Sequence, residues 1–281
     1  MQTIRFTKMQ GAGNDYVYVN CMEKKIENAN ETARRISDRH FGVGSDGLVL
    51  ICPSDKADFR MDMYNSDGTQ AEMCGNASRC VGKYVHDKGL TDKTVFTLET
   101  LAGIKTLELT LDEQGETATV RVNMGAPELV PKKIPIDAEG DRLVDMPVDV
   151  DGKEWRITGV SMGNPHAVTF IDDVDGLDIE KTGPGFENHM MFPNRINTEF
   201  AKIIDRDRIK MRVWERGAGE TLACGTGACA TLVAATLCGL VEGEADLELR
   251  GGTLHIKWDR EDNNVYMTGP AEFVFEGEIT L

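Results

Sequence analysis

The sequence predicts a mixed α/β (α+β) protein built from two similar halves. Segments typical of β-strands outnumber helical ones, and a Cys-Gly motif with its surroundings occurs twice, at positions 74 and 224. The chain has 281 residues, of which 41% are hydrophobic and 28% charged, as is typical of a globular protein. This length suits one large domain or two domains of roughly 100–150 residues each.

The predicted strands alternate apolar and polar residues, are rich in Val, Thr and Ile, and are interrupted at Gly, Asp or Asn. They cover residues 48–51, 95–98, 105–111, 117–123, 155–160, 167–171, 198–204, 210–214, 247–249, 253–257 and 265–268.

Three helices are predicted, over residues 31–39, 76–88 and 226–238. The second and third are followed directly by Gly89 and Gly239, where a left-handed C-terminal cap is expected. The stretch 125–135 is rich in Pro and Gly, which indicates a linker between the two halves.

An internal repeat is the most informative feature of the sequence. Residues 63–76 align with residues 213–226, so that Cys74 matches Cys224. Gly13-Asn14 matches Gly163-Asn164 at the same offset of 150 (224 − 74), with no net insertion between the two blocks. Two blocks in one register indicate a duplicated domain.

Cys74 and Cys224 each precede a predicted helix and are each followed by Gly. Free N–H groups and the dipole at a helix N-terminus favour negative charge, so a thiol there is expected to have a lowered pKa and to ionise near neutral pH. Two such thiols on opposite sides of one carbon suit removal of a proton from one face and its return to the other. The helix ends suit binding of a carboxylate. The structural alternative is a pair of buried cysteines at helix starts.

A polar set surrounds the repeat and resembles a site for an amino-acid head group. Arg216 suits bidentate binding of a carboxylate, and Glu215 suits pairing with an ammonium. His166 suits orienting or deprotonating a thiol. The alternatives are that each Asn of the set is a turn residue, that Arg216 and Glu215 form a surface ion pair, and that His166 has a structural role. The remaining members of the set are Asn14, Asn65, Asn164 and Asn197.

Composition and motifs argue against several other classes. The net charge of −16 disfavours a nucleic-acid partner. No apolar run reaches the length of a membrane span, and residues 1–6 have no signal-peptide core, so a cytoplasmic protein is expected. No Cys/His spacing fits a zinc site, and no Lys lies in a setting typical of pyridoxal enzymes. The Gly-rich segment 42–47 matches the dinucleotide-binding pattern, but it precedes a strand rather than the helix that such a site requires. We therefore expect no metal and no organic cofactor.

Taken together, the motifs resemble the diaminopimelate epimerase family over nearly the whole chain. The matching blocks are residues 11–15, 39–44, 64–68, 73–76, 163–166, 215–217, 223–227 and 267–271. The resemblance implies cofactor-independent epimerisation of LL-2,6-diaminopimelate to the meso form, in lysine and peptidoglycan precursor synthesis. It implies two pseudo-symmetric domains, each a curved and mainly antiparallel sheet around a central helix, over residues 1–123 with a returning strand 270–281, and over 124–269. It also implies a homodimer.

The resemblance also assigns roles to individual residues. Cys74 and Cys224 would be the acid/base pair, assisted by His166 and Glu215. Backbone N–H groups of one Cys-Gly motif and its repeat would bind the reacting carboxylate, through Gly75, Asn76, Gly225 and Thr226. The remaining substrate contacts would come from Asn14, Asn65, Asn164, Asn197, Glu215 and Arg216.

Two positions depart from the pattern of some family members. Gly47 stands where some carry Gln, and Phe275 stands where some carry a Tyr at a dimer contact.

Two other functions stay open at this point. One is a racemase of a cyclic substrate such as proline or hydroxyproline, and the other is an amino-acid-binding protein without catalysis. A site for a second carboxylate and ammonium, made by Arg216 and Glu215, argues against the first. The two matched thiols argue against the second.

Overall fold

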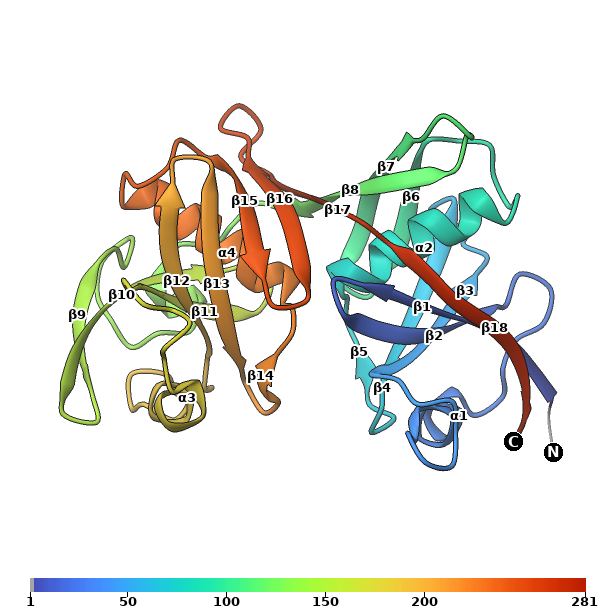
Figure 1. Ribbon diagram of the computed structural model, residues 1–281, viewed down its shortest axis with the longest axis horizontal. Helices are drawn as coiled ribbons and strands as arrows, with labels where there is room; N and C mark the ends of the chain where they lie inside the picture. Colours follow the sequence, from blue (N-terminus) through green and yellow to red (C-terminus); the bar gives the residue numbers. More distant parts are fainter. Residues whose placement is uncertain (1–2) are drawn as a thin grey trace. The chain divides into compact units, whose positions relative to one another are not determined.

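The computed structural model describes residues 3–281 and contains 18 β-strands and four α-helices in that range. It confirms the predicted mixed α/β class. The chain forms two compact units, one extending to Asn123 and completed by Thr268–Leu281, the other comprising Met124–Met267. The red C-terminal strand in Figure 1 therefore belongs with the blue N-terminal strands. None of the described helices is long and apolar enough to cross a membrane.

The first unit contains two helices, of which the second is central. Its elements are β1 (Thr3–Gly11), β2 (Asn14–Asn20), α1 (Ala29–Ser37), β3 (Gly47–Cys52), β4 (Phe59–Asn65), β5 (Gln70–Ala71), α2 (Gly75–Asp87), β6 (Val95–Thr100), β7 (Gly103–Leu111), β8 (Thr117–Gly125) and, from the end of the chain, β18 (Glu272–Thr280).

The second unit repeats this plan around its own helix. Its elements are the 3-10 helix η1 (Pro131–Lys133), β9 (Met146–Val150), β10 (Lys153–Ser161), β11 (Pro165–Phe170), α3 (Ile179–Glu187), β12 (Asn197–Asp205), β13 (Arg208–Glu215), β14 (Gly219–Thr221), α4 (Gly225–Leu237), β15 (Glu244–Leu249), β16 (Gly252–Trp258) and β17 (Val265–Gly269).

Strand registers in the two units repeat at the offset seen in the sequence. In the parallel pair β2–β3, Tyr16 lies opposite Gly47, and in the parallel pair β11–β12, His166 lies opposite Asn197. Both residues of the first pair differ from those of the second by 150 (166 − 16 and 197 − 47). The next pairs, β3–β4 and β12–β13, are antiparallel in both units. The repeat therefore reflects two copies of one topology.

The predicted central helices are confirmed as α2 and α4, each displaced by one residue from its expected range. Helix α2 packs on β1, β2 and β7, and α4 on β10, β11, β12, β15 and β16. Their small residues allow close approach: a Cβ on Gly82 would lie 3.0 Å from a Val120 methyl. The predicted caps are also present, with φ of 69° at Gly89 and 72° at Gly239.

The other helical predictions were less accurate. The helix expected over 31–39 lies at Ala29–Ser37, because the Asp38 carboxylate accepts the N–H groups of His40 and Phe41 and ends the helix. Helix α3 was not predicted, since its sequence contains Pro184. The expected linker over 125–135 contains η1 and a bridge from Glu128 to Ser161.

Candidate functional site

Cys74 and Cys224 occupy the same local position, as the N-cap residues of α2 and α4. Both have extended backbones, with φ of −135° and −118°. Their carbonyls accept the first intrahelical bonds, from Ser78 and Ala228, both at 2.9 Å. The three N–H groups that precede each of these donors therefore have no partner within the helix. Each cysteine thus lies beside a cluster of N–H groups that favours an anion.

In the first unit, the Cys74 thiol contacts Asn14. Cys74 Sγ donates to Asn14 Oδ1 at 3.3 Å, and Asn14 Nδ2 donates to Asp46 Oδ2 at 2.8 Å. Asn14 can reach the thiol because Gly13, with φ of 82°, turns the chain between β1 and β2. Asn65, the last residue of β4, donates to Thr69 Oγ1 at 3.0 Å.

In the second unit, His166 is fully buried between two hydrogen-bonding partners. Its Nδ1 lies 2.7 Å from Glu199 Oε1, and its Nε2 lies 2.9 Å from Asn164 Oδ1. Glu199 is itself 0% exposed and lies on β12, the strand parallel to the one that carries His166. Glu199 also lies against the first turn of α4, because a Cβ on Gly227 would be 2.5 Å from its Oε1. The partial positive charge of that turn stabilises a carboxylate.

Cys224 lies beside two acidic residues. Its Sγ is 3.4 Å from Thr226 Oγ1, and Glu215, hydrogen-bonded to Thr221, also hydrogen-bonds the thiol. Burial, and then the charges of Glu215 and Glu199, raise the pKa of Cys224 well above its usual value. Burial likewise raises the pKa of Glu215. The expected lowering of the Cys224 pKa was therefore wrong, because desolvation and two carboxylates outweigh the helix dipole.

Asn197 and Arg216 are also in contact, but through the backbone. Asn197 Oδ1 accepts the Arg216 N–H at 2.9 Å, and Asn197 Nδ2 donates to the Pro165 carbonyl at 2.9 Å. Asn197 is 4% exposed, so its side chain braces the chain where β13 ends. The Arg216 side chain is exposed and its Nη1 donates to the Asn194 carbonyl at 2.9 Å.

Most of the site residues that were predicted from the sequence lie in two groups, one in each unit. The first contains Asn14 and Cys74, followed by Gly75 and the buried Asn76. The second contains Asn164, His166, Asn197, Glu215, Arg216, Cys224, Gly225 and Thr226. Asn65 is the one predicted residue outside these groups, since its amide donates to Thr69.

Two residues in these groups were missed at the level of sequence. Asp46 was read only as part of a Gly-rich segment, and Glu199 only as part of a strand. Glu199 did carry a signal, since a carboxylate among the residues Thr198, Phe200 and Ala201 of a buried strand requires a partner.

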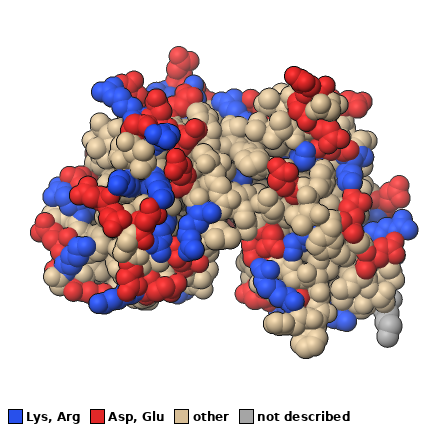
Figure 2. Space-filling model, viewed as in Figure 1, with Lys and Arg blue, Asp and Glu red and all other residues tan. Residues whose placement is uncertain are grey.

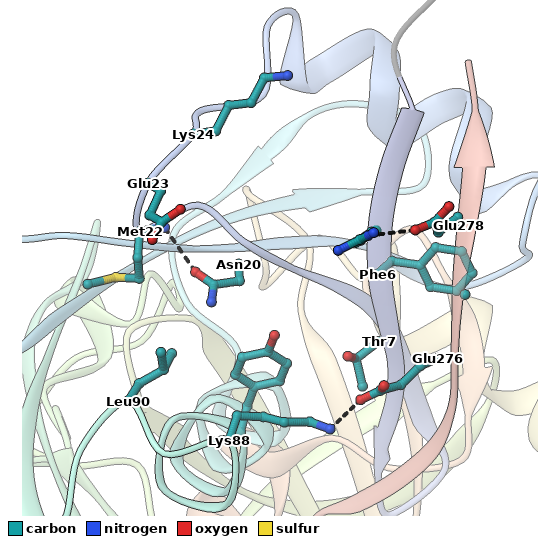
Figure 3. Close-up of a pocket in the computed structure, with 13 residues that line it drawn as sticks. Phe6, Thr7, Asn20, Met22, Glu23, Lys24, Lys88, Leu90, Glu276 and Glu278 are labelled. Atoms are coloured by element: carbon teal, nitrogen blue, oxygen red, sulfur yellow. Dashed lines mark hydrogen bonds and ion pairs between the residues drawn. The ribbon is translucent and has the colours of Figure 1, made fainter.

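The described pocket in Figure 3 is separate from both groups. It has a volume of about 810 Å³ and is lined by residues of β1, β18 and the end of α2, with the pairs Arg5–Glu278 and Lys88–Glu276 at its wall. Neither Cys74 nor Cys224 lines it.

Figure 2 shows acidic and basic side chains intermixed over the visible face. Among residues 3–281, no cluster of three or more His, Cys, Asp or Glu side chains is arranged to hold a metal.

Comparison with known proteins identifies close relatives along the full chain. A family model described as diaminopimelate epimerase matches residues 6–130 and 158–274. A diaminopimelate epimerase of Acetivibrio thermocellus is 60% identical over 278 residues, covering 99% of each chain. A diaminopimelate epimerase of Methanococcus maripaludis (strain S2) is 56% identical over 278 residues, covering 99% of this chain and 100% of its own.

Solved structures of more distant proteins share the fold. A hydroxyproline epimerase from Agrobacterium vitis aligns with a TM-score of 0.70 at 14% identity, over 99% of this chain and 91% of its own. A phenazine biosynthesis protein from Bacillus anthracis aligns with a TM-score of 0.69 at 19% identity, over 100% of both chains. At these identities the likeness concerns the fold alone.

Proposed function

Because the chain belongs to the diaminopimelate epimerase family, we propose that it converts LL-2,6-diaminopimelate to the meso form with two cysteines and no organic cofactor or metal. The observation that supports this most strongly is the matched placement of Cys74 and Cys224 at the N-termini of α2 and α4. An amino-acid epimerase must remove a proton from Cα and return one to the opposite face. Two thiols at equivalent helix starts supply the two groups that this reaction needs.

In the proposed reaction, the thiolate of one cysteine takes the Cα proton and becomes a thiol, while the other thiol donates its proton to the opposite face. The electron pair of the broken C–H bond is delocalised into the α-carboxylate, whose negative charge increases. The N–H groups of Gly75 and Asn76, and of Gly225 and Thr226, would stabilise that charge as it develops. The exchange conserves protons: one thiol is gained and one thiol is lost.

Cys224 is suited to begin as the proton donor. Its burial and the nearby Glu215 and Glu199 carboxylates favour the neutral thiol. We assign Glu215 and His166 as the groups that assist Cys224, since Glu215 hydrogen-bonds its thiol and His166 interacts electrostatically with Glu215. Substrate-binding roles for Asn14, Asn65, Asn164, Asn197, Glu215 and Arg216 are part of the same proposal.

Three substrates distinguish the proposal from its alternatives. Specificity constants for LL-diaminopimelate, L-lysine and L-proline are measured on one preparation. We expect diaminopimelate to be turned over and the other two to react very poorly, since neither carries a second amino-acid head group. Faster turnover of L-proline would replace the proposal with a cyclic amino-acid racemase. Binding of diaminopimelate without turnover would replace it with a binding protein.

Arg216 is proposed to bind the distal carboxylate of diaminopimelate. We expect Arg216→Met to lower kcat/KM for this substrate roughly 10- to 100-fold, because a desolvated carboxylate would lose its charged partner. Arg216→Lys should restore little, because a point charge does not reproduce the planar fork of a guanidinium. The matched control is Arg206→Met, at an exposed arginine paired with the exposed Glu242. If Arg216→Met equalled that control, this role would be refuted.

The proposal places the reaction in lysine and peptidoglycan precursor synthesis, and hence in the cytoplasm, where amino-acid precursors are made.

We also propose a homodimer that uses the exposed Val274 and Phe275 of β18. Light scattering of the purified chain is expected to give twice its 31.0 kDa mass. Phe275→Glu is expected to shift the chain toward the monomer, with Met190→Glu as the control at another exposed apolar residue. A monomeric wild-type chain would refute the dimer.

A further inference from the structure

We propose that Asp46 is a positioning residue that turns the side-chain amide of Asn14 so that its oxygen faces the Cys74 thiol. The inference rests on the proposed function in one respect, because it gives Asp46 a part in the proton transfers of Cys74. The three residues come from separate places in the first unit. Asn14 begins β2, Asp46 directly precedes β3, and Cys74 caps α2.

The Asp46 carboxylate is held from several sides. Its Oδ2 accepts the Asn14 amide at 2.8 Å and the Asp15 backbone N–H at 3.1 Å. The Asp46 N–H in turn donates to the Asp15 carbonyl at 2.8 Å. The other carboxylate oxygen, Oδ1, accepts from Arg39 Nη2 at 3.2 Å. These contacts tie Asp46 to the start of β2, so its carboxylate is a fixed acceptor beside Asn14.

A fixed carboxylate determines which way the Asn14 amide points. An ionised carboxylate only accepts hydrogen bonds, so it requires the nitrogen of the amide and not the oxygen. With Nδ2 committed to Asp46, Oδ1 is directed to Cys74 Sγ, at 3.3 Å. An asparagine without such a neighbour presents either end, because the two ends have nearly the same shape. Asp46 removes that choice.

The chosen orientation matters for proton transfer. An amide oxygen accepts a hydrogen bond from a thiol but cannot donate one to a thiolate. It therefore stabilises the protonated form of Cys74. The thiolate is therefore a stronger base than it would be beside an amide N–H. The Cα–H of an amino acid is a very weak acid, and a stronger base removes its proton faster. Asp46 thus raises the basicity of Cys74 through Asn14.

The titratable groups around Cys74 leave a clear window for measuring this effect. Tyr18 of β2 and Cys80 of α2 interact electrostatically with Cys74. Burial raises the pKa of Tyr18 well above its usual value and that of Cys80 to about 11. Neither group ionises between about pH 6 and pH 9, the range in which an ordinary thiol of pKa ~8.5 titrates. The charged groups that face Asp46, directly or through one partner, are Asp15, Arg39 and Lys8.

The experiment measures the rate of Cys74 alkylation by iodoacetamide against pH, in the full chain, by mass spectrometry of the Cys74 peptide. Asp46→Ala frees the Asn14 amide to turn its nitrogen to the thiolate. We expect the pH midpoint of alkylation to fall by about one unit, which is about tenfold faster modification at pH 7. Asp46→Asn removes the charge but keeps an acceptor oxygen beside Asn14, because the Asp15 backbone N–H, which donates to Oδ2 in the native chain, holds the amide oxygen at that position. We expect its midpoint to stay near that of the wild type.

Two controls separate orientation from charge and from loosening. Asp15→Asn removes a carboxylate of the same cluster and leaves the Asn14 side-chain contacts in place, so its midpoint should not move. In an Asn14→Ala background, Asp46→Ala should cause no further shift, because the residue through which it acts is gone. If Asp46→Ala does not fold, Asp46→Ser serves instead, since its side chain is too short to hold the Asn14 amide.

Three results would overturn the inference. They are an unchanged midpoint in Asp46→Ala, an equal fall in Asp46→Asn or Asp15→Asn, and a full effect of Asp46→Ala in the Asn14→Ala background. Epimerisation of LL-diaminopimelate is measured on the same variants, and kcat should fall in Asp46→Ala but not in Asp46→Asn. A midpoint that falls in Asp46→Ala, although the wild-type chain does not epimerise LL-diaminopimelate, would refute the proposed function alone. Activity with an unmoved midpoint would refute the role of Asp46 alone.

Discussion

Replacing either Cys74 or Cys224 with alanine is expected to lower kcat for epimerisation of LL-diaminopimelate by about 10³-fold or more. In the proposed mechanism each thiol moves one of the two protons, and we expect no group of similar basicity to replace it at its helix start. The Glu215 carboxyl next to Cys224 is a poor replacement, because a carboxylate is a much weaker base than a thiolate toward carbon. Initial rates with purified variants measure the loss.

The matched control for these variants is Cys238→Ala. Cys238 is the C-cap residue of α4 and lies at the opposite end of the helix from Cys224, with its Sγ 3.4 Å from Thr158 Oγ1. We expect this variant to keep nearly full activity. Near wild-type turnover in a folded Cys74→Ala or Cys224→Ala chain would exclude the mechanism that uses both thiols.

Replacing Glu199 with leucine is expected to destabilise the second unit by about 2–3 kcal/mol. The substitution leaves His166 Nδ1 buried without the acceptor that lies 2.7 Å away in the native chain. Glu199→Gln should cost less, because the amide oxygen of Gln still accepts the Nδ1–H bond. Gln also removes one of the charges that raise the pKa of Cys224, so that pKa should fall.

Urea unfolding of the full chain measures this difference, followed by the fluorescence of Trp155 and Trp214, which lie in the core of the second unit. Glu154→Leu is the control, because Glu154 is an exposed residue of β10 and its replacement should change stability by less than about 0.5 kcal/mol. Equal midpoints for Glu199→Leu and Glu154→Leu would show that the His166–Glu199 pair contributes nothing to stability.

The duplicated architecture was predictable because the repeat preserves local chemistry. In each half a helical segment follows the Cys-Gly pair and ends at a Gly, which predicts a helix with a left-handed C-terminal cap, and both copies formed one. Helix α3 was not predictable in this way. Its Gly183 and Pro184 disfavour a helix locally, but Gly183 lets Trp214 pack against the helix backbone, since a Cβ there would lie 2.2 Å from the ring.

The placement of the two proposed acid/base cysteines at helix starts was predictable from the sequence, whereas their surroundings were not. Cys74 and Cys224 were recognisable because helix-start chemistry is local in sequence. Asp46 and Glu199 were not, because their roles depend on contacts 32 and 33 residues away, with Asn14 and His166. The pKa of Cys224 is raised by burial and by the carboxylates of Glu215 and Glu199. Both effects depend on the packing of the folded chain, which no local sequence pattern reveals.

The most direct test of the two-thiol mechanism follows the proton itself. LL-diaminopimelate is incubated with the wild-type chain in deuterated water, and both isomers are recovered at low conversion and analysed by mass spectrometry. We predict one deuterium in each meso molecule formed and none in the recovered LL isomer, because the proton removed by one thiol is not the one supplied by the other. Meso product that retains the original hydrogen, or LL isomer that gains deuterium as fast as product forms, would contradict the mechanism.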